Sequence, residues 1–210
     1  MGSLNDFNRV APFYDRLKRW VFGDAVRRSE REGLDEIFPS AKVLIVGGGT
    51  GEILEALHEI RPDAHVWYVD ASSEMIQRAR TRNIDQMICF VHGTDDDLPE
   101  GLTFDVIITP FFLDLFDADR LLRIISGLLP RLHPYGLWFV ADFVDTGKVW
   151  HRVLLSAMYR FFRSVARVEA RTLPDWQGLL RETGMREVRS RSFYGGFIRS
   201  VVYCRQPFTA

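Results

Sequence analysis

The clearest chemical signal in the sequence is a cluster of glycines between an apolar run and a helix-forming stretch. Val43–Val46 is rich in β-branched residues, Gly47–Gly51 contains four glycines, and Glu52–Leu57 has the composition of a helix. A strand, a glycine turn and a helix in this order present backbone amides to a nucleotide-like ligand. The sequence therefore predicts a ligand site at the end of this strand.

The spacing of the glycines narrows the type of ligand. Gly47, Gly49 and Gly51 are spaced G-x-G-x-G, whereas the dinucleotide fingerprint has its third glycine one residue later, where this chain has Glu52. A carboxylate in the first turn of a helix disfavours a pyrophosphate at that helix N-terminus. It does not disfavour a ligand that has a cationic part and no phosphate, such as S-adenosylmethionine.

A carboxylate follows the next predicted strand along the chain. Asp70 lies nineteen positions after Gly51, where an acidic side chain can accept hydrogen bonds from both ribose hydroxyls of an adenosine. The same carboxylate also suits NAD, and the alternative roles are a helix cap or a solvent contact. We expect Asp70 to bind the ligand, because the preceding strand ends in the glycine turn.

The loop after the third predicted strand is acidic. Gly93–Pro99 contains three consecutive carboxylates, and we expect one of them, or the backbone beside it, to contact the adenine amino group. No fourth ligand or calcium-loop spacing accompanies them, so no metal site is predicted. Cys89 and Cys204 lie far from other metal ligands in the sequence and are expected to be reduced core residues.

The end of the fourth predicted strand is where an acceptor is expected. Thr109–Phe112 lies there, at the edge where α/β sheets meet their ligands. Asp114 is either a base on the acceptor side or the start of a helix cap, and both roles stay open. His92 is expected in the core, whereas His151 is the histidine expected to face an acceptor.

Strands and helices alternate through most of the chain, which indicates a parallel sheet with helices on both faces. The predicted strands are Val43–Val46, His65–Val69, Met87–His92, Phe104–Thr109 and Gly136–Asp142, followed by an antiparallel pair, Arg186–Phe193 and Phe197–Cys204. The predicted helices are Glu52–Ile60, Ser73–Thr81, Asp117–Leu129, Lys148–Arg167 and one from Trp176 to Arg181, after a helical N-terminal segment.

Composition and charge limit the class of protein. A chain of 210 residues is enough for a single α/β domain. The formal net charge of -1 provides no overall field for nucleic acid. No apolar run is long enough to span a membrane and the N-terminus lacks a signal-peptide core, so a cytoplasmic location is expected by default.

Taken together, these segments resemble the class I S-adenosylmethionine-dependent methyltransferases. The resemblance rests on Val43–Gly51 as the first motif, Val69–Ala79 as the ribose motif, Phe104–Ile108 as the fourth strand, and Leu128–Gly136 with Val140–Phe143 as the fifth. The segments Arg9–Asp15, Leu173–Asp175, Gly184-Met185 and Tyr194–Ile198 are similar to the quinone-biosynthesis C-methyltransferases of the ubiquinone/menaquinone type. The resemblance departs at Ile45, where the family usually has Asp or Glu, and at Thr94, where it usually has Asp.

The resemblance implies a Rossmann-like fold with a mostly parallel seven-stranded sheet that ends in an antiparallel hairpin. It divides the single domain into an N-terminal helical cap (1–40), a cofactor-binding core (41–145), an inserted helix or lid (146–172) and a C-terminal helix with hairpin (173–210). The expected cofactor-binding residues are Tyr14, Gly47, Gly48, Gly49, Thr50, Gly51, Asp70, Ala71, Met75, Thr94, Asp95, Asp96, Thr109 and Pro110. The expected acceptor-binding residues are Phe112, Tyr159, Phe162 and Tyr194.

The predicted function is methyl transfer from S-adenosylmethionine to a small apolar or aromatic molecule, at carbon or oxygen. Alignment of the nucleophile with the methyl group can by itself lower the activation barrier by about 7–11 kcal/mol. A catalytic triad is therefore not required. Asp114, His151 and Tyr14 are the candidate bases. The alternatives are a non-catalytic S-adenosylmethionine-binding protein and an NAD-dependent oxidoreductase. The predicted helix Lys148–Arg167, with its arginines, is a candidate for peripheral membrane contact.

Overall fold

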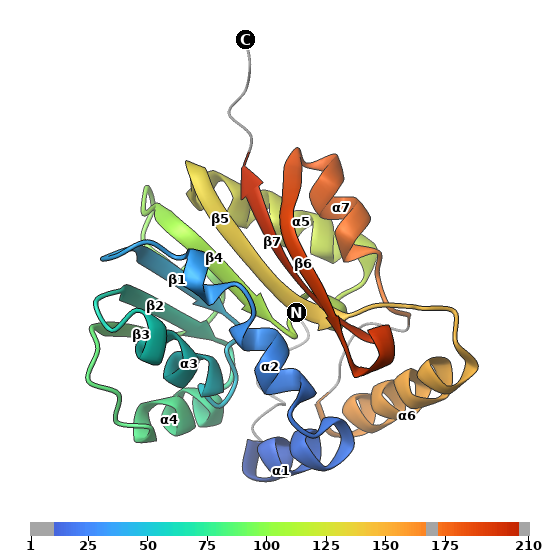
Figure 1. The fold of residues 1–210 in the computed structure, drawn as a ribbon. Coiled ribbons are helices and arrows are strands. Elements are labelled where there is room, and N and C mark those ends of the chain that lie inside the picture. Colours follow the sequence, from blue (N-terminus) through green and yellow to red (C-terminus); the bar gives the residue numbers. More distant parts are fainter. Residues whose placement is uncertain (1–10, 167–171, 206–210) are drawn as a thin grey trace.

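One mixed sheet forms the centre of the protein (Figure 1). The computed structural model describes residues 11–166 and 172–205, and the backbone alone for residues 11–14 and 162–166. The strands are β1 (Lys42–Val46), β2 (His65–Asp70), β3 (Ile88–His92), β4 (Phe104–Pro110), β5 (Leu132–Phe143), β6 (Met185–Phe193) and β7 (Ile198–Arg205). Their order in the sheet is β3-β2-β1-β4-β5-β7-β6.

The first five strands are parallel, and β7 pairs antiparallel with both β5 and β6. The parallel sheet with a final antiparallel hairpin is therefore confirmed. The main difference from the predicted bounds is β5, which begins at Leu132 instead of Gly136. Phe104 of β4 pairs with Leu132, and the register then shifts before Val106 pairs with Leu137, so the bulge accommodates the additional residues.

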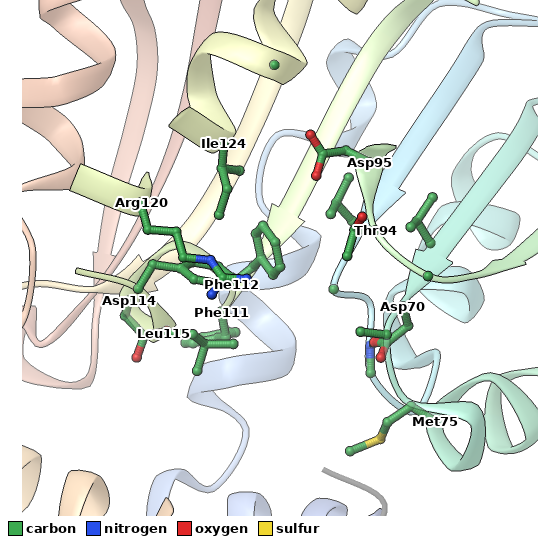
Figure 2. Close-up of a pocket in the computed structure, with 18 of the residues that line it drawn as sticks. Asp70, Met75, Thr94, Asp95, Phe111, Phe112, Asp114, Leu115, Arg120 and Ile124 are labelled. Carbon is green, nitrogen blue, oxygen red and sulfur yellow. The ribbon is translucent and has the colours of Figure 1, made fainter. Parts of the chain in front are cut away.

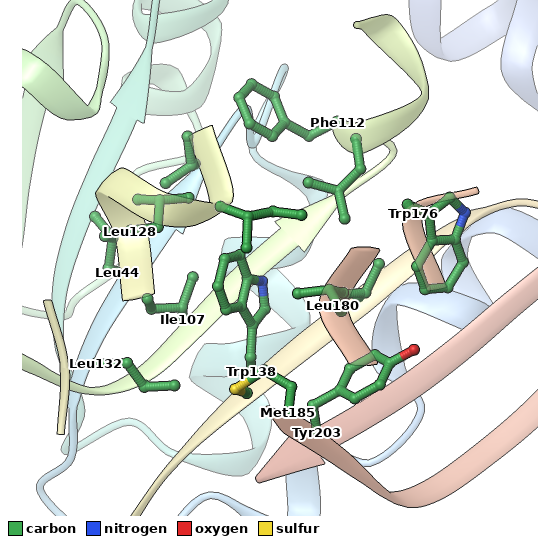
Figure 3. Packing of buried hydrophobic residues seen from close by; sticks show 14 of the residues in the cluster. Leu44, Ile107, Phe112, Leu128, Leu132, Trp138, Trp176, Leu180, Met185 and Tyr203 are labelled. Carbon is green, nitrogen blue, oxygen red and sulfur yellow. The ribbon is translucent and has the colours of Figure 1, made fainter. Parts of the chain in front are cut away.

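Helices cover both faces of the sheet. They are α1 (Ala11–Phe22), α2 (Ala25–Arg31), α3 (Glu52–Ile60), α4 (Ser73–Thr81), α5 (Ala118–Leu128), α6 (Val149–Ala166) and α7 (Trp176–Glu182). Side chains of a strand point to alternate faces, so Leu44 packs with α5 and α7 while Val43 packs with α3 and α4. Figure 3 shows the first of these layers around Trp138, which is fully buried.

Two sequence-based expectations about burial were wrong for the same reason. Cys89 and His92 are exposed, not in the core. Both belong to β3, which is the edge strand of the sheet, and its β-branched and aromatic composition does not distinguish an edge from a central position. Cys204 is half-buried near the end of β7.

Candidate functional site

A pocket of about 410 Å³ opens at the carboxyl ends of β1, β2, β3, β4 and β5. The chain order of the strands reverses between β1 and β4, and ligands of open α/β sheets bind at such a switch point. Figure 2 shows two groups of side chains across this pocket, with Asp70 and Met75 on one side and Phe111 and Asp114 on the other. We call these the donor end and the acceptor end, because the sequence predicts the methyl donor at Asp70 and the methyl acceptor at the end of β4.

Asp70 is the central polar group of the donor end. Its Oδ2 accepts a hydrogen bond from the Gly49 backbone N–H at 3.0 Å, and its Oδ1 accepts one from the Ser72 N–H at 2.9 Å. Burial raises the pKa of Asp70 to about 6, while the two backbone donors favour its ionised form. Each carboxylate oxygen has a further lone pair, so the side chain can still accept hydroxyl donors from the pocket.

The glycine turn has little space for side chains. A Cβ at Gly47 would lie 2.3 Å from the Phe112 ring, and one at Gly48 would lie 2.4 Å from the Tyr68 ring. Gly49 is different, since no atom lies within 4 Å of its Cβ position and the residue lines the pocket. The turn therefore keeps its backbone close to the pocket and leaves room there for a ligand.

Glu52 does not face this pocket. Its Oε2 lies 2.6 Å from the Lys18 ammonium of α1, and this partner lowers the pKa of Glu52 against the opposing effect of burial. An ion pair therefore balances the negative charge of Glu52, and this charge does not disfavour a pyrophosphate. Thr50 also faces α1, because its hydroxyl donates to Asp15 at 2.7 Å. The spacing of the glycines is then the feature of this turn that disfavours NAD.

The acidic loop contributes to the donor end. Thr94, Asp95 and Asp96 line the pocket, whereas Asp97 turns back and accepts a hydrogen bond from the Thr94 N–H at 2.8 Å. Burial and the neighbouring Asp96 carboxylate raise the pKa of Asp95. The Thr94 hydroxyl accepts from the Asp96 N–H, so it caps the short turn that presents these carboxylates.

The end of β4 places aromatic rings in the pocket and keeps Thr109 out of it. The Thr109 hydroxyl is fully buried and accepts a hydrogen bond from the Trp138 indole N–H at 3.0 Å. Phe111 has a φ of 49°, a left-handed conformation that is uncommon for a bulky residue. This sharp turn places Phe111 and Phe112 along the pocket. Pro110 is buried and does not line it.

A pair of buried carboxyl groups lies at the acceptor end. Asp142, at the end of β5, accepts hydrogen bonds from the Leu113 and Asp114 N–H groups at 2.9 and 3.3 Å, and its carboxyl group also hydrogen-bonds that of Asp114. Burial raises the pKa of both groups, and that of Asp142 is raised further by the Asp114 charge. We therefore expect Asp142 to retain a proton that it shares with Asp114.

Asp114 is the member of this pair that meets the pocket. It lines the pocket, it is 5% exposed, and its Oδ1 has no hydrogen-bond partner. The cap of α5 is instead Asp117, whose side chain accepts from the Arg120 N–H at 2.9 Å. The capping alternative for Asp114 is therefore wrong, and its unpartnered oxygen lies at the pocket.

The acceptor residues expected from sequence separate into three groups. Phe112 and Tyr159 line the pocket. Tyr194 does not, since its hydroxyl donates to the Val21 carbonyl and its ring packs against Phe22. The side chain of Phe162 lies outside the described residues, as does that of Tyr14, which was expected at the cofactor and as a candidate base.

His151 is also outside the pocket. It is 1% exposed, stacks on Phe197 with ring centroids 4.7 Å apart, and hydrogen-bonds the Thr146 hydroxyl. These contacts connect the start of α6 to the final hairpin, so His151 has the environment of a packing residue. The expectation that it faces an acceptor was wrong.

Sequence reasoning missed several residues that shape the acceptor end. Phe111, Phe143, Arg120 and Met158 line the pocket, and Asp142 lies behind Asp114. Asp142 ends a predicted strand beside the Thr109–Phe112 segment, which is the one signal that could have pointed to it. Within the described residues no cluster of His, Cys, Asp or Glu is suited to a metal ion.

Comparisons with known proteins agree with this geometry. A family described as "Methyltransferase domain" matches residues 43–136. A demethylmenaquinone methyltransferase of Thermotoga maritima is 33% identical over 61% of this chain and 57% of that protein. A ubiquinone/menaquinone biosynthesis C-methyltransferase of Syntrophotalea carbinolica is 25% identical over 95% of this chain and 92% of that protein.

The fold is also that of solved methyltransferases. The magnesium protoporphyrin IX methyltransferase of Synechocystis PCC 6803, with bound S-adenosylhomocysteine, matches with a TM-score of 0.67 and 17% identity over 97% of this chain and 98% of that chain. A Burkholderia thailandensis 1,6-didemethyltoxoflavin N1-methyltransferase matches with a TM-score of 0.70 and 16% identity, over 97% and 88% of the two chains. At such identities the likeness concerns the fold.

The domain match, the relatives and the fold together show that the chain is similar to class I S-adenosylmethionine-dependent methyltransferases. The names of the two relatives specify menaquinone or ubiquinone. The open space at Gly49 beside the buried Asp70 carboxylate fits the adenosyl part of S-adenosylmethionine, the cofactor expected from the sequence. The chain spans little more than half of the T. maritima relative.

Proposed function

We propose that the protein methylates a small, apolar, hydroxylated aromatic molecule at carbon or oxygen, with Asp114 as the base. One observation carries this proposal: a single pocket joins the Asp70 side chain at one end to a buried, unpartnered Asp114 oxygen at the other. The names of the two relatives, which specify quinone-type substrates, support an acceptor of this class.

The donor end of the pocket would hold the cofactor. Asp70 would accept the ribose hydroxyls, and Thr94, Asp95 or Asp96 would contact the adenine amino group. Ala71 and Met75, which also line the pocket, would contact the apolar parts of the nucleoside. S-adenosylmethionine, when bound, supplies an electrophilic methyl group on a sulfonium.

The acceptor end would hold the ring and remove water. Its walls are largely apolar and come from the turn after β4, the end of β5 and α6. They include Phe111, Phe112, Leu115, Phe116, Phe143, Met158 and Tyr159. Stacking between such rings and an aromatic acceptor favours a fixed orientation. Helix α6, which lies in the segment expected to be a lid, would cover the acceptor end, because its Met158 and Tyr159 line the pocket.

Asp114 would take the acceptor's proton. An aromatic hydroxyl or its ring carbon becomes nucleophilic as the proton leaves, and the acceptor gains one methyl for the one proton that Asp114 receives. Because Asp142 retains a shared proton and donates it to the Asp114 carboxylate, Asp114 can be ionised while it remains buried. A base with a pKa raised toward neutrality is suited to this transfer.

Methyl transfer to a reduced quinone precursor tests this function directly. The protein is incubated with S-adenosylmethionine and demethylmenaquinol, or with simple naphthols and catechols, and the product is identified by mass spectrometry. We expect a methylated product whose formation Asp114→Asn strongly slows. Tight S-adenosylmethionine binding without transfer to any aromatic acceptor would instead favour a non-catalytic binding protein.

A further inference from the structure

The segment that contains helix α6 differs from the rest of the chain in its charge. Between Lys148 and Arg167 the sequence has five basic residues and no acidic residue, although the whole chain has a net charge of -1. No helix among residues 11–166 and 172–205 is long and apolar enough to cross a membrane. A basic helix with an apolar side but without spanning length has the composition of an interfacial helix.

The outer side of α6 is apolar and exposed. The exposed fractions are 77% for Val149, 48% for Trp150, 64% for Val153 and 40% for Phe161. Val149 and Val153 are one helical turn apart, and Phe161 lies two further turns along the same side. We call these four residues the outer face of α6. Exposed apolar side chains gathered on one side of a helix mark a site of interaction.

The opposite side of α6 packs against the rest of the protein. His151 and Tyr159 are buried, and Leu154, Leu155 and Met158 pack against the cluster around Phe22 and Phe197. Figure 1 shows α6 at the end of the sheet where β5 leads into it. Because Met158 and Tyr159 also line the pocket, the outer face lies one helix diameter from the acceptor end.

We propose that the outer face of α6 docks the protein on an anionic lipid surface. The apolar side chains would enter the boundary between headgroups and acyl chains. Trp150 packs against His151 and Tyr194, and the exposed half of its amphipathic ring would face that boundary. The exposed Arg152 and Arg160 would contact lipid phosphates. Arg152 also lies 3.6 Å from Asp145, but both side chains are exposed and such a pair is weak.

A lipid surface fits this face better than a second copy of the chain. A symmetric dimer through this face would bring the exposed Arg152 and Arg160 of one helix near those of its copy, and like charges would repel each other. A lipid surface supplies the opposite charge. If the proposed function holds, docking would also place α6, which covers the acceptor end, against the phase in which an apolar acceptor dissolves.

Vesicle flotation of the full chain tests the docking without an activity measurement. We expect the protein to float with vesicles of phosphatidylcholine and phosphatidylglycerol, and poorly with phosphatidylcholine alone. Val153→Glu should weaken the binding to anionic vesicles about tenfold, because it places a negative charge in the centre of the outer face. Met87→Glu, at a residue that is 68% exposed on the distant sheet edge, is the matched control and should bind as the original chain does.

A second variant separates the role of charge from that of apolar contact. Arg152→Gln with Arg160→Gln should remove the preference for phosphatidylglycerol, and salt raised from about 0.1 M to about 1 M should have a similar effect. Equal flotation of Val153→Glu and Met87→Glu, or equal binding to both vesicle types, would overturn the proposal. So would a dimer in solution that Val153→Glu converts to a monomer, since the outer face would then be a protein interface.

The result of the vesicle flotation does not depend on whether the protein transfers a methyl group. Val153→Glu should still methylate a water-soluble acceptor at the original rate, because Val153 does not line the pocket. A protein that floats with anionic vesicles but methylates nothing would retain the docking surface and lose the proposed function.

Discussion

The two ends of the pocket are built in different ways. The donor end comes from loops that directly follow β1, β2 and β3, and its polar contacts are mostly to backbone N–H groups. The acceptor end combines the turn after β4, the end of β5 and the inner side of α6. Local sequence therefore determines the donor end, whereas the acceptor end depends on contacts between segments far apart in the chain.

This difference explains what the sequence could predict. Gly47, Asp70 and Thr94 follow strands at characteristic spacings, and each lies at the pocket as expected. Thr109 was expected there because it ends a strand, but its hydroxyl points to Trp138 in the core. Alternation along a strand gives two faces, and the sequence does not show which face a strand-end residue takes.

The sequence predicted less of the acceptor end, because the geometry of that end depends on contacts between residues far apart in the chain. The role of Asp142 depends on its hydrogen bonds to residues 28 and 29 positions away. The position of Phe111 depends on a left-handed backbone that its residue type does not suggest. His151 was expected at an acceptor because it lies on a helix beside the sheet, but packing against Phe197 buries it.

The largest expected effect is at the acceptor end. Asp114→Asn removes the proposed base while it preserves the shape of the side chain, and we expect the rate constant of methyl transfer to fall by about 10²–10⁴-fold. The affinity for S-adenosylmethionine should stay unchanged, because Asp114 lies at the other end of the pocket. Single-turnover kinetics and calorimetry measure the two quantities. If Asp114→Asn instead lost affinity for S-adenosylmethionine and kept the rate constant of methyl transfer, Asp114 would lie at the cofactor and not at the acceptor.

The next largest effect is at the donor end. Asp70→Ala removes the carboxylate proposed to accept two ribose hydroxyls, and at about 1.5 kcal/mol for each charged hydrogen bond the Kd for S-adenosylmethionine should rise about a hundredfold. Asp105→Ala is the matched control, since that carboxylate also accepts a backbone N–H but lies outside the pocket. Equal affinities for the two variants, measured by calorimetry, would exclude Asp70 from the cofactor site.

A smaller effect concerns pH. Burial raises the pKa of Asp70 to about 6, so its ionised form increases as the pH rises from 5 to 7. Because the ionised carboxylate is the form that accepts both hydroxyls, cofactor affinity should increase about tenfold over this range. In Asp70→Asn the affinity for S-adenosylmethionine should not change with pH. A flat pH profile in the original chain would indicate that another residue binds the ribose. An unchanged slope in Asp70→Asn would assign the titration to another group.

The smallest effect on function is expected at Thr109. Thr109→Val leaves the buried Trp138 indole N–H without its partner, and the free energy of unfolding should fall by about 1–3 kcal/mol. Thr109→Ser retains the hydroxyl and should preserve most of that stability. Denaturant unfolding measures the difference, while the Kd for S-adenosylmethionine should be the same in both variants. A weaker Kd in Thr109→Val at full stability would return Thr109 to the cofactor site.

The central claim is that one pocket holds the donor at Asp70 and the acceptor at Asp114. A crystal structure with S-adenosylhomocysteine tests it most directly. We predict that the ribose hydroxyls contact the Asp70 carboxylate and that the thioether sulfur faces the space between Phe111 and Asp114. An adenosyl group bound elsewhere, or a sulfur that faces away from Asp114, would contradict the account.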